Sequence, residues 1–113
     1  MSLFPALCLL ILAAFLEVGG DALVRKGILA AGLSRGVWFA AGAVVLFVYG
    51  VVVNAPGWDF GRMLGIYVAL FFVAAQVIAY AMFSQSPSVP VLVSGAFILT
   101  GGLIMSIWRA GPA

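Results

Sequence analysis

The chain has 113 residues, of which 66% are hydrophobic and 7% are charged, and its formal net charge is +2. A soluble domain carries about 25% charged residues, so this sequence predicts an integral membrane protein. The small positive charge is too dispersed to indicate binding to nucleic acid. Because there is no histidine and only one cysteine, a Cys/His metal site, a Ser–His or Cys–His catalytic couple and an intrachain disulfide are excluded. We therefore expect neither an enzyme nor a protein that binds a cofactor or a metal.

Four hydrophobic segments account for nearly the whole chain. A helix needs about 20 mostly apolar residues to cross a bilayer, and each segment is close to that length. Backbone polar groups find no water in lipid, so such segments must be helical. We expect helices at residues 3–24, 36–53, 64–83 and 89–108, which make residues 1–113 a single all-α, four-helix transmembrane domain.

The basic residues are shared almost equally between the two sides of the membrane. With four spans, the chain ends and the middle loop lie on one side, which carries Arg62 and Arg109. The other side carries Arg25, Lys26 and Arg35, which we place in or beside the first loop. The distribution of Lys and Arg sets orientation in the membrane. This near balance leaves two alternatives open: a single orientation fixed by a weak bias, or insertion both ways and pairing as an antiparallel dimer.

Glu17 is the strongest functional candidate, because it lies inside the first predicted span. A carboxylate at that depth costs several kcal/mol unless it is protonated, paired or facing a wet cavity. A carboxyl group in a medium of low dielectric constant binds a proton more readily than it does in water. If a proton and a cation compete for Glu17, binding of one expels the other, and cation export is coupled to proton import. The alternative is a permanently protonated Glu17 that is hydrogen-bonded inside the helix bundle.

Three further polar residues are candidates for the same site. Asp21 lies one helical turn after Glu17 on the same face, although its spacing to Arg25 also fits an interfacial ion pair. Counted from the predicted helix ends, Gln76 matches Glu17 in depth and Tyr80 matches Asp21. We interpret these pairs as two polar stripes facing one cavity. Alternatively, Gln76 forms a hydrogen bond within the bundle and Tyr80 is an interfacial tyrosine.

Small residues predict where helices approach one another closely. Gly20 lies on nearly the same face as Glu17, and the fourth span contains Gly95, Gly101 and Gly102. Small side chains let helix backbones come together in lipid. We expect Gly20 to contact another helix, and the fourth-span glycines to form a packing face that could lie between subunits. Four short helices enclose little volume, so a transport path would need a second copy or another partner.

Taken together, these features resemble the small multidrug resistance family. The residues that carry the resemblance are Glu17, Gly20 and Arg25 in the first span, Phe83-Ser84-Gln85 and Pro90 around the third loop, and the stretch from Gly95 to Gly102. In the middle of the chain, Gly61-Arg62 followed by Tyr67 is more similar to the neighbouring YnfA-like family of the same transporter clan. The resemblance covers essentially the whole chain.

The resemblance implies an antiparallel homodimer in a bacterial inner membrane, or a pair formed with a paralogue. It also implies that Glu17 of both subunits forms one site for protons and a small organic cation. Tyr67 joins the candidates for this site, because the drug exporters have a tyrosine in the third helix. This chain lacks the tryptophan that follows that tyrosine, and it has Asp21 where a small or hydroxyl residue is usual. Both differences lie at positions that the resemblance implies determine which substrate the drug exporters bind.

The expected function is therefore proton-coupled export of small organic cations, with protons, the cation and membrane lipid as partners. Two alternatives belong to other classes. The chain could be a non-transporting membrane subunit whose Glu17 pairs with a cation on another protein. It could also be a flippase component that acts on a lipid-linked headgroup.

Overall fold

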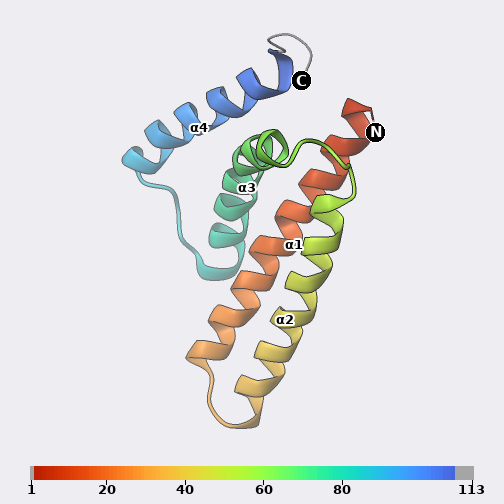
Figure 1. The fold of residues 1–113 in the computed structure, drawn as a ribbon. Coiled ribbons are helices and arrows are strands. Elements are labelled where there is room, and N and C mark those ends of the chain that lie inside the picture. The colour runs from red at the N-terminus through yellow and green to blue at the C-terminus, as the bar shows by residue number, and fades with distance from the viewer. Residues whose placement is uncertain (1, 109–113) are drawn as a thin grey trace.

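The computed structural model describes residues 2–108. Within that range it contains four α-helices and no strands: α1 (Leu3–Leu29), α2 (Leu33–Asn54), α3 (Phe60–Phe83) and α4 (Val89–Ile107), as Figure 1 shows. All four are long and apolar enough to cross a membrane. The prediction of an all-α protein with four spans is confirmed. Arg109, which entered the charge comparison, lies outside the described residues.

The helices extend further than hydropathy predicted. α1 continues to Leu29, so Arg25 and Lys26 belong to its last turns and not to the first loop. Lysine and arginine are good helix formers, and charge alone does not end a helix. The chain reverses at Gly32, whose φ of 64° is one that side chains with a Cβ rarely adopt, and α2 begins at the next residue. α3 likewise begins at Phe60, earlier than expected.

The four helices form a flat, open arrangement in which α1 is central. α1 contacts both α2 and α3, while α4 contacts only α3 among the described helices (Figure 1). The molecule measures 55 × 34 × 19 Å. A helix with its side chains is about 10 Å wide, so the chain is only about two helices deep in its thinnest direction. Most of α2 and α4 is consequently exposed, and the buried residues of these helices are Gly42 and Val53 in α2 and Gly95 and Gly102 in α4.

A seam of small residues brings α1 against α2. The buried residues Ala6, Ala13, Gly20 and Gly27 recur every seven positions along α1. A seven-residue repeat keeps one narrow face of a helix turned toward its neighbour. On α2, a Cβ added to Gly42 would lie 2.7 Å from Val24 Cγ2 and 3.1 Å from the carbonyl oxygen of Gly20. Only glycine permits so close an approach of the two backbones.

α3 and α4 pack through the glycines of α4. Gly95 lies against the ring of Phe72, and Gly102 lies against Ala69. Gly101 is exposed and would have no atom within 4 Å of an added Cβ, so it takes no part in packing within the chain. The structure thus places Gly20, Gly95 and Gly102 in contacts between helices of one chain, whereas Gly101 faces outward.

We predict that Gly42→Ala destabilises the protein by about 1–3 kcal/mol, because the added methyl group forces α1 and α2 apart. Gly50→Ala in the same helix is the matched control, since no atom lies within 4 Å of its added Cβ. The control should change stability by less than about 1 kcal/mol, and in the stabilising direction, because alanine favours the helix. Unfolding by a denaturing detergent in mixed micelles, followed by circular dichroism, measures both. Equal stability of the two variants would contradict close packing at Gly42.

Candidate functional site

Glu17 is joined to α3 by a hydrogen bond inside the membrane-spanning part of the molecule. The hydroxyl group of Tyr67 donates to Glu17 Oε1 over 2.8 Å. Tyr67 is 4% exposed, and Glu17 is partly buried. Within residues 2–108 no cationic side chain forms an ion pair with Glu17. The bond from Tyr67 engages Oε1 and comes from a neutral group, so it does not neutralise the charge of the carboxylate.

Aromatic rings from two helices surround this bond. The ring of Tyr67 lies 5.9 Å from that of Tyr49 in α2 and 6.1 Å from that of Phe71 in α3, measured between centroids. Three helices therefore contribute to the site. Sequence reasoning missed Tyr49, although it is the only side chain with a polar group between Trp38 and Asn54. Aromatic faces attract cations, so the surroundings of Glu17 suit an organic cation as well as a proton.

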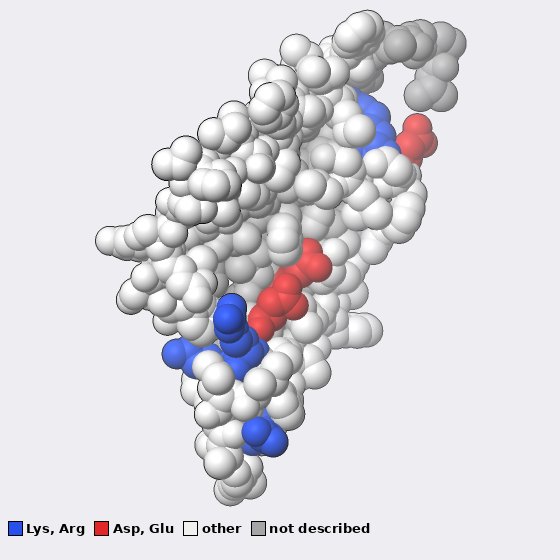
Figure 2. Space-filling view, turned by 90° about the vertical axis from the view of Figure 1, so that its left-hand side faces the viewer, with Lys and Arg blue, Asp and Glu red and all other residues white. Residues whose placement is uncertain are grey.

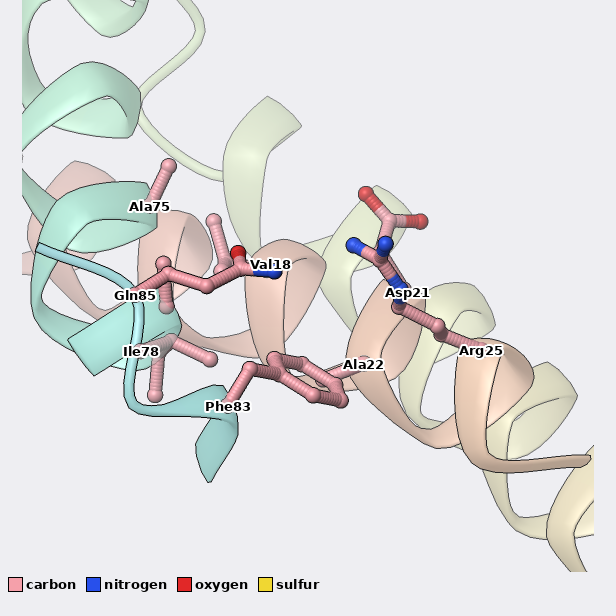
Figure 3. A pocket seen from close by; sticks show the side chains of 9 residues that line it. Val18, Asp21, Ala22, Arg25, Ala75, Ile78, Phe83 and Gln85 are labelled. Carbon is pink, nitrogen blue, oxygen red and sulfur yellow. The ribbon is translucent and has the colours of Figure 1, made fainter. Parts of the chain in front are cut away.

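A pocket of about 190 Å³ lies next to Asp21, between α1 and α3 (Figure 3). It is lined by Val18, Asp21, Ala22 and Arg25 of α1, by Ala75, Ile78, Ala79 and Phe83 of α3, and by Gln85 of the following loop. Asp21 and Arg25 both face the pocket, but in the described chain they form no ion pair. The guanidinium carbon of Arg25 lies 5.1 Å from the centroid of the Phe83 ring instead. The expected pairing of Asp21 with Arg25 is therefore not found.

The structure does not bring Gln76 or Tyr80 to Glu17. Gln76 lies nine residues after Tyr67, which is two and a half helical turns and therefore the opposite face of α3. It shares the face of Phe72, which packs on α4. Tyr80 is 66% exposed. Their neighbours Ala75 and Ala79 line the pocket beside Asp21, whereas Gln76 and Tyr80 do not.

Figure 2 shows how charge is distributed on the face that carries the site. The acidic side chains of α1 lie together in a hollow, and basic side chains gather beyond them toward the loop between α1 and α2. One of the basic residues of that end has a structural partner: Arg35 Nε donates to the carbonyl oxygens of Gly27 and Ala30, each over 3.2 Å, and Nη2 donates to that of Ile28 over 3.1 Å. These carbonyls lie at and just after the C-terminus of α1, where a cation stabilises the helix end. Arg35 is thus engaged in holding the helix end.

The other end of the molecule repeats this arrangement. Arg62 at the start of α3 donates to the carbonyl oxygens of Met105 and Ser106, over 3.2 and 3.4 Å, and so holds the C-terminal end of α4. Two of the four basic residues in the described range therefore stabilise helix ends. The remaining two, Arg25 and Lys26, lie beside the acidic hollow. In residues 2–108 no group of three His, Cys, Asp or Glu side chains could hold a metal ion.

The fold and this site define a class: an integral membrane protein of four helices with a carboxylate set among them. The chain is 32% identical over 111 residues to a UPF0060 membrane protein of Herpetosiphon aurantiacus, with 96% of this chain and 98% of the relative covered. It is 33% identical over 108 residues to a UPF0060 membrane protein of Rhodococcus erythropolis, with 93% and 97% covered. The chain belongs to the UPF0060 family of bacterial membrane proteins. No protein-family model matches it, and no solved structure matches it significantly.

Membership of this family decides between the two resemblances in the sequence. UPF0060 is the YnfA-like family, so the resemblance carried by Gly61, Arg62 and Tyr67 is the one that fits. Membership of the small multidrug resistance family is not supported. Tyr67 is also the residue that the structure places on Glu17. The part of the sequence that resembled the YnfA-like family therefore supplies the partner of the membrane carboxylate.

We predict that Tyr67→Phe costs about 1 kcal/mol of stability, since it removes the hydroxyl donor from a bond inside the bundle and leaves the ring in place. Tyr80→Phe is the matched control on the same helix, because its side chain is 66% exposed. It should change stability by less than about 0.5 kcal/mol. Unfolding in mixed micelles measures the difference. If both variants were equally stable, the hydrogen bond to Glu17 would contribute nothing to the fold.

Proposed function

We propose that this protein exports small organic cations in exchange for protons, with Glu17 as the shared binding site, and that it is a carrier and not an enzyme. The observation that carries the proposal is the hydrogen bond from Tyr67 to a carboxylate that has no cationic partner in the described chain. A carboxylate in lipid that is kept only for packing would be expensive. Glu17 is held in place by a neutral donor, Tyr67, so its negative charge stays available to an exchangeable ligand.

The position of Glu17 suits exchange between the two sides of the membrane. It lies fourteen residues after the first residue of α1 and twelve before the last, close to the middle of the helix. A site inside the membrane can be reached from either side by a modest movement of the surrounding helices. A proton and an organic cation both neutralise the carboxylate, so only one needs to be bound at a time. Release of one then requires arrival of the other, which is the coupling that an antiporter needs.

The open shape of a single chain favours a second copy. The acidic hollow lies on an outer face of the molecule (Figure 2), and one copy leaves that face uncovered. An antiparallel homodimer would bring two Glu17 residues to one enclosed site and give Gly101 a neighbour. The near balance of basic residues at the two ends is compatible with insertion in both directions. A paralogous partner would provide the same closure.

We predict that purified protein in liposomes moves protons when small organic cations are added, and that Glu17→Gln reduces this movement to that of empty liposomes. Glutamine keeps the size of the side chain and can still accept a hydrogen bond from Tyr67, but it cannot exchange a proton. A pH-sensitive dye inside the liposomes records the movement for each cation in a panel.

Asp59→Asn is the matched control, because Asp59 is a carboxylate in the loop before α3, away from the site. It should transport like the unaltered protein. Proton movement that persists in Glu17→Gln would exclude Glu17 as the coupling group. If the unaltered, folded protein moved no protons with any cation of the panel, the result would instead favour a non-transporting subunit or a component that acts on lipid-linked headgroups.

A further inference from the structure

The pocket beside Asp21 lies toward the C-terminal end of α1, on the side of Glu17 that carries Arg25 and Lys26. α1 has 27 residues, which at ~1.5 Å each span about 40 Å, whereas the hydrocarbon core is about 30 Å thick. α1 is thus about 10 Å longer than the hydrocarbon core is thick, and we place this excess at its C-terminal end, because Arg25 and Lys26 suit the headgroup layer. The pocket reaches the same level on α3, because Phe83 is the last residue of that helix.

Small side chains open the pocket, and a helix cap fixes its rim. Ala22, Ala75 and Ala79 leave space between α1 and α3 and form an apolar floor. At the end of α3, Ser84 takes a left-handed conformation (φ 54°), and the backbone N–H of Gln85 donates to the carbonyl oxygen of Ala79 over 3.1 Å. This capping motif folds the chain back over the helix end. The side chain of Gln85 consequently extends across the pocket toward α1 (Figure 3).

Opposite charges line the same pocket without neutralising each other. Asp21 supplies a carboxylate, Arg25 a guanidinium and Gln85 an amide, and within the described residues none of these side chains forms a hydrogen bond or an ion pair with the protein. Arg25 is held over the ring of Phe83, and Lys26 Nζ lies 5.5 Å from the centroid of the same ring. The pocket thus offers a positive group and a negative group that no ion pair joins in the described chain, which suits a ligand that carries both charges.

We propose that this pocket binds a membrane phospholipid headgroup that carries a phosphate and a primary ammonium group. Arg25 takes the phosphate, for which a guanidinium provides paired donors. Asp21 takes the ammonium group, and the amide of Gln85 can donate to the phosphate. A water molecule occupies about 30 Å³ of the liquid, so the pocket of about 190 Å³ holds a phosphate and a short amino alcohol. The acyl chains remain in the bilayer beside the exposed apolar surface of α3, where Val77 is 48% exposed.

This site is distinct from the proposed transport site. Glu17 and Tyr67 do not line the pocket, and the headgroup would lie toward the membrane surface from Glu17, starting one helical turn away at Asp21. Binding of the lipid requires neither a proton nor a transported cation. The proposal can therefore be tested on the purified protein without any measurement of transport, and its outcome does not depend on that of the liposome experiment.

The test measures which phospholipids stay bound to the full chain. Protein in detergent micelles is mixed with equal amounts of phosphatidylethanolamine and phosphatidylglycerol, and the retained lipid is counted by native mass spectrometry. Both lipids carry a phosphate, but only the first carries an ammonium group. We expect about fivefold more phosphatidylethanolamine to be retained, the scale of one partly exposed charge pair. Equal retention of the two lipids by the unaltered protein would overturn the proposal.

Single substitutions test which residue binds the phosphate and which binds the ammonium group. Asp21→Asn should abolish the preference and leave phosphatidylglycerol retention unchanged, whereas Arg25→Gln should reduce retention of both lipids. Lys26→Gln is the matched control, because Lys26 contacts the same ring without lining the pocket. It should retain lipids like the unaltered protein. A preference that survives Asp21→Asn, or equal losses in Arg25→Gln and Lys26→Gln, would contradict the assignment.

A soluble ligand with the same chemistry is tested in parallel. Phosphoethanolamine carries the phosphate and the ammonium group without acyl chains. We expect it to displace the lipid only at concentrations far above that of the lipid, because it gains nothing from the bilayer beside the pocket. Displacement at equal concentration would show that the pocket selects a soluble compound and would overturn the assignment to a membrane lipid.

Discussion

The structure depends on how closely α1 can approach its two neighbours. In lipid, helices gain no hydrophobic energy by associating, so their contacts rely on close packing and hydrogen bonds. The small residues Ala6, Ala13, Gly20 and Gly27 turn one face of α1 to α2, and Val18 and Ala22 turn another to α3. Glu17 lies between these faces. The same packing that holds three helices together therefore places a carboxylate where side chains from both neighbours can reach it.

Two polar regions result, at different depths along α1. Inside the membrane, Glu17 accepts a hydrogen bond from the neutral Tyr67, so its environment holds the side chain without supplying a permanent countercharge. Near the membrane surface Asp21 faces a pocket whose rim includes a cation, Arg25, and the two groups remain unpaired in the described chain. The cations Arg35 and Arg62 are instead engaged with helix ends. We therefore assign different roles to the two regions: the region of Glu17 would exchange a proton for a cation, and the pocket beside Asp21 would bind a lipid headgroup.

The sequence predicted which segments form membrane-spanning helices, but it did not predict which face of each helix meets its neighbours. Hydropathy identified all four spans, and it identified Glu17 as the carboxylate inside the first of them. The grouping of Gln76 with Glu17 rested on matched depth alone, and depth does not specify the face of a helix. The hydropathy of α3 identified the span but did not indicate which side of the helix would meet α1. Gln76 and Tyr67 lie on opposite sides of that helix, and the small residues of α4 packed against the side of Gln76. Tyr49 was not predicted as a site residue, because a lone tyrosine in an apolar helix forms no sequence pattern with its neighbours.

The sequence by itself determined that four helices cross a membrane, because lipid admits no backbone group without a partner and the apolar segments have spanning length. It also indicated that Glu17 lies inside the first of these spans. Only the tertiary structure decided that Tyr67 and Tyr49 surround this carboxylate and that Asp21 faces a separate pocket. The reason is rotational: the direction in which a side chain points depends on how each helix turns about its own axis. That rotation is set by the contacts of Gly20, Gly42 and Gly95 with neighbouring helices. The amino-acid sequence alone does not reveal these contacts.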